Sequence, residues 1–341
     1  MLLRHLRRTV AASIATAFVA ASAVAVSVVS PTPASAATNA VTIAVPAYFT
    51  DDALWNKVIA TPEVTYVIGH PLAPVAGQTY KADPDLQARL AKAKAAGKTT
   101  LVYVTGGYDK VDWQVVADRI DTVLGAYPAA DGVFIDEINY NQCEKYSSLT
   151  KGTGSAKGVR QRQANKLIVL NPGAPMLNCY EGLADGYVNL ERAERDIPAW
   201  TENVNMAGNV PFYSWMFTAA NRPKMWEVIH SVASNNASGA VDAALARNAS
   251  VIYLTDDVVR DIAKDNPYDN LPTDAFFKAL TDRVAEYNAG KSALPAVKAL
   301  VAPPTAAGVT TTTKGTSSAA AVTTTKKPVT KKVVKKAPKK K

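Results

Sequence analysis

Short, mostly apolar runs alternate with longer mixed stretches between about residue 41 and residue 257. Runs of this length that are apolar throughout are typical of strands buried on both faces of a parallel sheet. The pattern therefore predicts eight strands. They cover residues 41–49, 64–70, 99–108, 131–138, 166–173, 185–191, 225–231 and 250–257.

Two of the intervening stretches carry clear helix signals. Residues 83–97 begin with Asp83, a favourable N-cap, followed by Pro84 at the first helical position, and they end at Gly97. Residues 111–127 repeat apolar side chains at a helical spacing. We predict a helix over each of these ranges, whereas residues 192–224 fit a helix, an extra strand or a long loop.

Strands that alternate with helices require a mainly parallel sheet, because parallel neighbours need crossover connections. Eight repeats favour closure, so the predicted fold is a single-domain (β/α)8 TIM-type barrel over residues 37–302, a length typical of such barrels. The alternative is a doubly wound open sheet. No G-x-G-x-x-G or G-x-x-x-x-G-K-[ST] motif supports a nucleotide-binding version of that sheet.

The first residues have the features of an export signal. Arg4, Arg7 and Arg8 precede an apolar stretch, and the small-residue sequence around Ala34 and Ala36 resembles a cleavage site. We predict a secretory signal peptide over residues 1–36, which leaves a secreted or cell-wall-associated protein with no membrane span. An uncleaved membrane anchor also fits the length of the apolar stretch.

The far end of the chain differs in composition. Residues 303–341 contain ten lysines but no acidic and no aromatic residue, which predicts a disordered basic tail. Without this tail and residues 1–36, 25 basic residues face 29 acidic ones, so the net charge of +9 comes from the ends. The tail could bind anionic cell-wall polymers or act only as a solubilising segment. Nucleic acid is not expected, since no recognition motif accompanies the lysines.

Cys143 and Cys179 are the only cysteines. In an exported protein such a pair favours a disulfide, and two buried thiols are the alternative.

Polar side chains occur at the carboxyl end of every predicted strand, where a barrel of this type carries its reaction face. Three are acids: Asp136, Glu137 and Glu191. The others that we predict to bind substrate are Tyr48, His70, Tyr103, Tyr108, Asn171, His230 and Asp256.

Clustered carboxylates repel one another unless they bind a metal or one of them keeps a proton. His70 and His230 lack paired metal-ligand spacing, so a shared proton is favoured and no metal or cofactor is predicted. A carboxylate cluster of this kind is what glycoside cleavage uses, with one acid protonating the leaving oxygen while another group attacks or stabilises the cationic centre.

An ordered set of motifs resembles the spherulin-4 family: VPAYF, VYVTGGY, DGVFIDE, VLNPG, VNLE, IHS, YLTDD and NPYDNLP. The resemblance implies a (β/α)8 barrel and a secreted glycoside hydrolase acting on galactosamine-containing polysaccharide. It places the family's paired acids on Asp136 and Glu137 and its third acid on Glu191. The chain departs from the family at His70-Pro71 and the following LAPVAG, where an Asn-Pro and a Gly-Pro-Gly turn are usual.

These observations predict an endo-acting hydrolase of a polymer containing galactosamine or N-acetylgalactosamine. We assign Glu137 as the acid, Asp136 as the group that orients the substrate, and Glu191 as nucleophile or charge stabiliser. A non-catalytic, carbohydrate-binding wall or matrix protein of the same fold is the main alternative. A metal-dependent deacetylase or phosphodiesterase, with metal at Asp136, Glu191 and a histidine, is a third.

Overall fold

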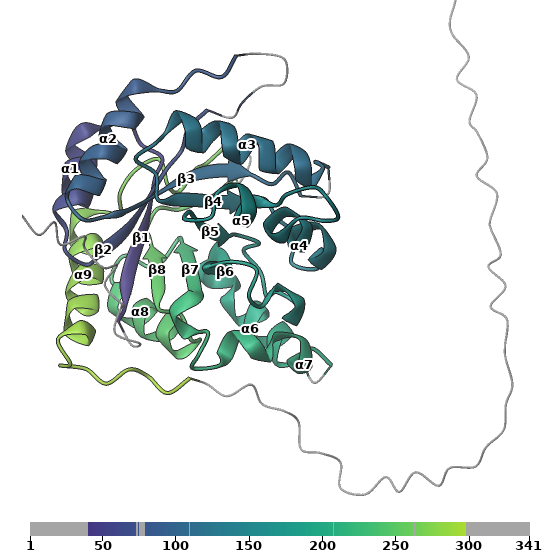
Figure 1. The fold of residues 1–341 in the computed structure, drawn as a ribbon. Helices are drawn as coiled ribbons and strands as arrows, with labels where there is room; N and C mark the ends of the chain where they lie inside the picture. The colour runs from purple at the N-terminus through teal and green to yellow at the C-terminus, as the bar shows by residue number, and fades with distance from the viewer. Residues whose placement is uncertain are drawn as a thin grey trace, which may run out of the picture. The chain divides into compact units, whose positions relative to one another are not determined.

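The computed structural model describes residues 40–297, except 73, 75–78, 109, 207, 262 and 263 (Figure 1). These residues belong to one of the two units into which the chain divides, Met1–Val301. The predicted signal peptide and the lysine-rich tail lie outside the described residues. Within the described part of the chain, no helix is long and apolar enough to cross a membrane.

The described residues form a closed barrel of parallel strands in the order of the sequence, from β1 to β8. Closure is made by β1 and β8, where Thr42 lies opposite Val251 and Ile43 opposite Ile252. The predicted (β/α)8 barrel is therefore confirmed and the open sheet is excluded. The strands are β1 (Thr42–Ala47), β2 (Val64–Gly69), β3 (Thr99–Thr105), β4 (Gly132–Asp136), β5 (Leu167–Leu170), β6 (Gly186–Ala193), β7 (Met225–His230) and β8 (Val251–Leu254).

Helices lie around the outside of these strands (Figure 1). The α-helices are α1 (Asp52–Ala60), α2 (Pro84–Ala95), α3 (Trp113–Ala126), α4 (Cys143–Lys151), α5 (Val159–Arg162), α6 (Ile197–Asn205), α7 (Val210–Tyr213), α8 (Ala237–Ala246) and α9 (Asp274–Asn288). The 3₁₀ turns are η1 (Asn178–Tyr180), η2 (Glu194–Asp196), η3 (Ser214–Phe217) and η4 (Arg222–Lys224).

Local sequence explains where the two predicted helices begin and end. The Asp83 carboxylate accepts hydrogen bonds from the backbone N–H groups of Asp85 and Leu86, and Pro84 opens α2. After the helix, Gly97 adopts a φ of 83°, which glycine reaches without a steric cost. Asp112 caps α3 through the N–H of Gln114. Both predicted helices are confirmed.

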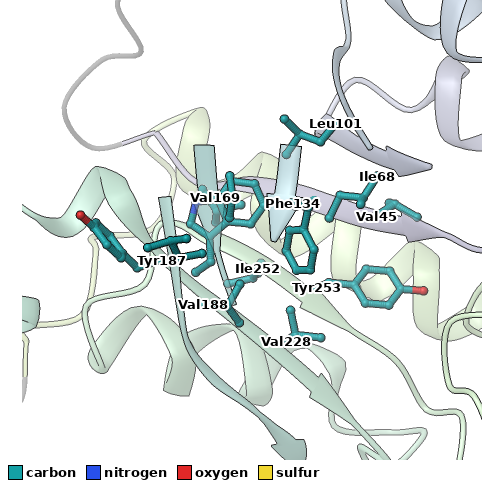
Figure 2. Close-up of a cluster of buried hydrophobic side chains, with 14 of the residues drawn as sticks. Val45, Ile68, Leu101, Phe134, Val169, Tyr187, Val188, Val228, Ile252 and Tyr253 are labelled. Atoms are coloured by element: carbon teal, nitrogen blue, oxygen red, sulfur yellow. The ribbon is translucent and has the colours of Figure 1, made fainter. Parts of the chain in front are cut away.

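The barrel interior is filled by apolar and aromatic side chains (Figure 2). Phe134 and Tyr253 come from β4 and β8, and each is at most 3% exposed. Side chains of this size leave no pore through the barrel, so its chemistry belongs to the strand ends.

Two connections depart from a regular alternation. Between β5 and β6 the chain makes only the short turn η1 and no α-helix. Of the segment that the sequence left open, residues 192 and 193 extend β6, and the rest forms two α-helices and three 3₁₀ turns and, in its described residues, no further strand. Both connections lie at the carboxyl ends of strands that carry candidate site residues.

Candidate active site

A cavity of about 270 Å³ opens where β4, β5 and β6 end. It brings together five of the residues predicted from the sequence, which come from four different strand ends and one loop. The lining residues are Tyr108, Asp136, Asn171, Pro172, Gly173, Glu191, His230, Pro267 and Tyr268.

Asp136 is the last residue of β4 and its carboxyl group lies in a largely buried environment. Burial raises its pKa to about 7, and the negative charge of Glu191 acts in the same direction. The backbone N–H of Glu137 and the Tyr103 hydroxyl donate to the carboxylate and partly offset this. Asp136 therefore exchanges its proton near neutral pH, as a general acid or base must.

Asn171 holds Asp136 and Glu191 side by side. Its Nδ2 donates 2.8 Å to Asp136 Oδ1 and 2.5 Å to Glu191 Oε2, so these two carboxylate oxygens are at most 5.3 Å apart. The amide orientation is fixed because Asn171 Oδ1 accepts a hydrogen bond from the Gly173 N–H at 3.0 Å. A single buried amide thus sets the spacing of two acids.

Glu191 is anchored from its other side by Tyr268, whose hydroxyl donates to Glu191 Oε1 at 2.6 Å. Burial, followed by the charge of Glu191, raises the pKa of Tyr268, so this hydroxyl stays a donor. Gly173 makes the turn beneath Glu191 possible. It has a φ of 57°, and an added Cβ would lie 3.1 Å from the Glu191 Cβ.

Glu137 follows Asp136 but is not among the residues that line the cavity. Its φ of 54° is unusual for a residue with a side chain, and its carboxylate accepts a hydrogen bond from the Thr105 hydroxyl. Its carbonyl accepts from the N–H of Tyr108 at 2.6 Å, and Tyr108 itself has a φ of 48°. Two strained residues therefore support each other beside the acids, as often found at functional sites.

Tyr48, His70 and Tyr103 form an aromatic cluster at the ends of β1, β2 and β3. The His70 ring centroid lies 4.8 Å from that of Tyr48 and 4.6 Å from that of Tyr103. Tyr48 also meets the ring of Tyr268 edge-on at 5.9 Å, which connects the cluster to the acids. These predicted residues therefore lie beside the cavity.

His230 lines the cavity from the end of β7. Burial lowers its pKa, with the positive charge of Arg195 acting in the same direction, so the ring favours its neutral form near pH 7. Ser231 Oγ accepts from the N–H of Val259 and lies 3.0 Å from His230 Nδ1. Because Nδ1 is paired with the serine hydroxyl, Nε2 is the ring nitrogen that a substrate can hydrogen-bond.

Asp256, another predicted site residue, does not line the cavity either. Its carboxylate accepts hydrogen bonds from the N–H and the hydroxyl of Thr273, at 3.0 and 2.6 Å. Thr273 is the N-cap residue of α9, so Asp256 joins the end of β8 to that helix.

The chain offers no evident metal centre at these acids: within the described residues, no group of three or more His, Cys, Asp or Glu is arranged to hold an ion.

Cys143 and Cys179 form the predicted disulfide, with Cα atoms 5.8 Å apart. Cys143 is the first residue of α4 and Cys179 lies in η1, so the bond joins the connections that follow β4 and β5. These are the connections that extend from Asp136 and Asn171.

Sequence reasoning missed Tyr268, although its motif NPYDNLP had been recognised. The tyrosine comes from a loop after the last strand, 77 residues beyond Glu191, and no strand-end pattern indicates it. A rule that looks only at strand ends cannot find a side chain that reaches the site from such a loop.

Comparisons with known proteins agree with the fold. Residues 42–283 match the family model of spherulation-specific family 4, which confirms the resemblance seen in the sequence. Among solved structures, Sph3 of Aspergillus clavatus in complex with GalNAc is similar, with 20% identity and a TM-score of 0.53 over 72% of this chain and 98% of that chain. A search among curated protein sequences finds no match.

Other solved structures are less similar. The endo-β-1,4-mannanase of Thermotoga petrophila has 9% identity and a TM-score of 0.44 over 74% of this chain and 78% of that chain. The glycoside hydrolase domain of PelA from Pseudomonas aeruginosa has 12% identity and a TM-score of 0.39 over 62% and 93%.

Proposed function

Because the chain belongs to spherulation-specific family 4, we propose that it is an exported glycoside hydrolase that cleaves within a polysaccharide containing galactosamine or N-acetylgalactosamine. One observation carries the proposal: Asp136 and Glu191 share a single amide donor in one cavity, and Asp136 titrates near neutral pH. A pair of neighbouring acids, one of which can give up a proton near neutral pH, is what glycosidic cleavage requires.

In this mechanism Asp136 donates its proton to the glycosidic oxygen as the bond between that oxygen and the anomeric carbon breaks. Glu191 attacks the anomeric carbon from the opposite side or stabilises its positive charge. Water then completes hydrolysis, and Asp136 takes the proton back. The acid role, first assigned to Glu137, passes to Asp136 because Glu137 accepts a hydrogen bond from Thr105 and does not line the cavity.

Glu137 becomes a positioning residue in this scheme. Its backbone N–H donates to the Asp136 carboxylate, and its carbonyl holds the strained loop at Tyr108. Both contacts are made by its backbone, so loss of its side chain should have little effect on the protonation of the leaving group.

Retention of anomeric configuration is expected. The two acid oxygens that share the Asn171 amide are at most 5.3 Å apart, which is shorter than the separation of about 6.5–9.5 Å in an inverting pair and compatible with the spacing of about 5–5.5 Å in retaining enzymes. An adjacent N-acetyl group of the substrate could serve as nucleophile in place of Glu191, with the same stereochemical outcome.

The substrate class is supported by the aromatic cluster of Tyr48, His70 and Tyr103, since flat rings suit sugar faces. It is also supported by the GalNAc bound in Sph3 of Aspergillus clavatus. Export is supported by the predicted signal peptide and by the disulfide, which forms and persists in oxidising surroundings.

The test is release of reducing ends from purified galactosaminogalactan and from cell-wall polymers. We expect release by the wild type and a fall of roughly 10²–10⁴-fold in Asp136→Asn, the usual contribution of general acid catalysis. Proton NMR of the first product should show the original anomeric configuration. A folded wild type that releases nothing from any of these polymers would contradict the proposal.

A non-catalytic carbohydrate-binding protein is the second candidate, favoured by the lysine-rich tail, which could hold such a protein on an anionic wall. It predicts sugar binding without turnover in the wild type and in Asp136→Asn alike. Hydrolysis by the wild type that Asp136→Asn abolishes would reject it.

A further inference from the structure

A second cavity, of about 500 Å³, lies next to the first. The two are separated by a short stretch of backbone, because Gly173 and Glu191 line the first while the residues that follow them, Ala174 and Arg192, line the second. Arg192 also ties the two walls together, since its Nη2 donates to the Gly173 carbonyl at 3.3 Å. A volume of this size is typical of ligand sites.

Arg192 has hydrogen-bonding capacity that the protein does not use. Its Nε is buried and has no hydrogen-bond partner within the described residues. Burial lowers the pKa of the guanidinium, and the nearby charge of Asp196 acts in the opposite direction. The Asp196 carboxylate, however, forms an ion pair with Arg195, at 3.9 Å. An unmatched buried donor is costly, and the guanidinium to which it belongs lines the cavity, where an anion would compensate its positive charge.

The walls of this cavity are suited to a sugar ring. Tyr140 is 42% exposed and Met206 is 55% exposed, although both are large apolar side chains. Burial raises the pKa of Tyr213, and the neighbouring Tyr140 hydroxyl raises it further. The two tyrosines therefore lie close enough to interact electrostatically. Tyrosine presents an apolar face and a polar tip, and both match a sugar.

We propose that this second cavity binds an acidic sugar residue, whose carboxylate or phosphate group is held by the Arg192 guanidinium and whose ring lies against Tyr140 and Tyr213. The planar fork of arginine fits the two oxygens of either anion. The first cavity cannot take this residue, since Asp136 and Glu191 would repel it. In a polysaccharide of mixed sugars, the acidic sugar therefore lies in the second cavity and a neutral or basic sugar lies in the first.

This inference rests on the proposed function in one respect: the acidic sugar belongs to the polysaccharide that is cleaved. Binding of the acidic sugar does not itself require cleavage. It adds a preference to that function: bonds beside an acidic residue should be cut in preference to bonds in a wholly neutral stretch.

The test is calorimetric binding of tetragalacturonate and of its fully methyl-esterified form, which has the same length without the charge. We expect the wild type to prefer the charged form and Arg192→Met to lose that preference, with about 10- to 100-fold weaker binding of tetragalacturonate. Arg195→Met is the matched control, because it removes a neighbouring arginine whose side chain is 68% exposed, and it should keep the preference. Because the lysine tail also attracts the charged probe, binding is measured at high salt, which screens exposed charges far more than a pair inside a cavity.

Two further measurements separate the remaining possibilities. Tyr140→Ala should weaken the charged and the esterified forms by the same factor, and it alters an exposed residue if Arg192→Met does not fold. Binding of galactose 6-phosphate, compared with galactose, distinguishes phosphate from carboxylate as the preferred anion. Arg192-dependent binding of either anion supports the proposal.

Equal affinity of the wild type for the charged and neutral probes in both pairs would overturn the inference, as would a preference that survives in Arg192→Met. The proposed function fails by a different result. Polymer hydrolysis without any charge preference removes only the acidic-sugar site, whereas Arg192-dependent binding without hydrolysis of any polymer removes only the hydrolase.

Discussion

Asp136 is a carboxyl group that the fold keeps largely neutral at a pH where an ordinary aspartate is ionised. Its pKa is raised in the folded chain to about 7, whereas an unfolded aspartate titrates at about pH 4. Between these two pH values, the folded chain holds a proton that the unfolded chain has released. The free energy of unfolding therefore falls as the pH rises through this window. Above it, the full cost of a buried, crowded charge is present.

Asp136→Asn should consequently be more stable than the wild type at pH 8, by roughly 2–4 kcal/mol, while it loses activity. The amide is neutral at every pH and keeps an acceptor for Asn171. Chemical denaturation at pH 8 and at pH 4 measures the difference, which should nearly vanish at pH 4. A variant that is less stable than the wild type at pH 8 would show that ionisation of Asp136 does not destabilise the folded chain.

At the level of single residues, the sequence indicated which acids meet but not how they face. Asp136, Asn171 and Glu191 could be found because each stands at a strand end, and parallel strands of a barrel end on one face. The orientation of Glu137 could not be predicted, because it depends on a left-handed backbone conformation that a side-chain pattern does not encode. Arg192 follows Glu191 directly, yet the sequence alone gives no sign that its Nε is buried without a partner.

At the level of elements, β4 is held very close to β5 at its first residue. A Cβ built on Gly132 would lie 2.2 Å from the carbonyl oxygen of Leu167, which is backbone and cannot move aside. The two residues are partners in the strand register. Gly132 therefore sets the spacing of the two strands that carry Asp136 and Asn171.

Gly132→Ala should destabilise the fold by about 1–3 kcal/mol or more, since overpacking forces strands apart. Gly125→Ala is the matched control: it lies within α3, no atom is within 4 Å of the added Cβ, and alanine favours helices by up to about 1 kcal/mol. Thermal unfolding should move in opposite directions in the two variants. A rise in the unfolding temperature of both variants would mean that the backbone at Leu167 moves aside without cost.

The strands could be predicted because each is a short apolar run, and a barrel interior filled by side chains such as Phe134 and Tyr253 demands such runs. The connections were harder. The connection from β5 to β6 contains only the short 3₁₀ turn η1, and a disulfide holds it in place. Because it forms no α-helix, its sequence lacks the helical spacing of apolar residues by which a connection can be predicted. Residues 194–224 form several short helices because no single apolar face runs through them.

At the scale of the whole molecule, the disulfide joins two connections that surround the acids. Cys143 and Cys179 are 36 residues apart in sequence, and a crosslink of that span stabilises by about 3–4 kcal/mol in the chain-entropy description. Denaturation of the wild type with and without reductant should show this loss. The double variant Cys143→Ser, Cys179→Ser should be equally unstable in both conditions; a wild type that is indifferent to reductant would contradict the prediction.

The lysine-rich tail should serve attachment and not chemistry. It contains no acid and no aromatic residue, and every group proposed to act on substrate lies within residues 48–268. Deletion of residues 305–341 should leave hydrolysis of a soluble oligosaccharide unchanged. The same deletion should weaken retention on anionic cell walls at low salt, with the difference disappearing as salt screens the charges. Equal retention of both proteins at low salt would mean that the tail is only a spacer, whereas slower hydrolysis by the truncated protein would mean that it reaches the site.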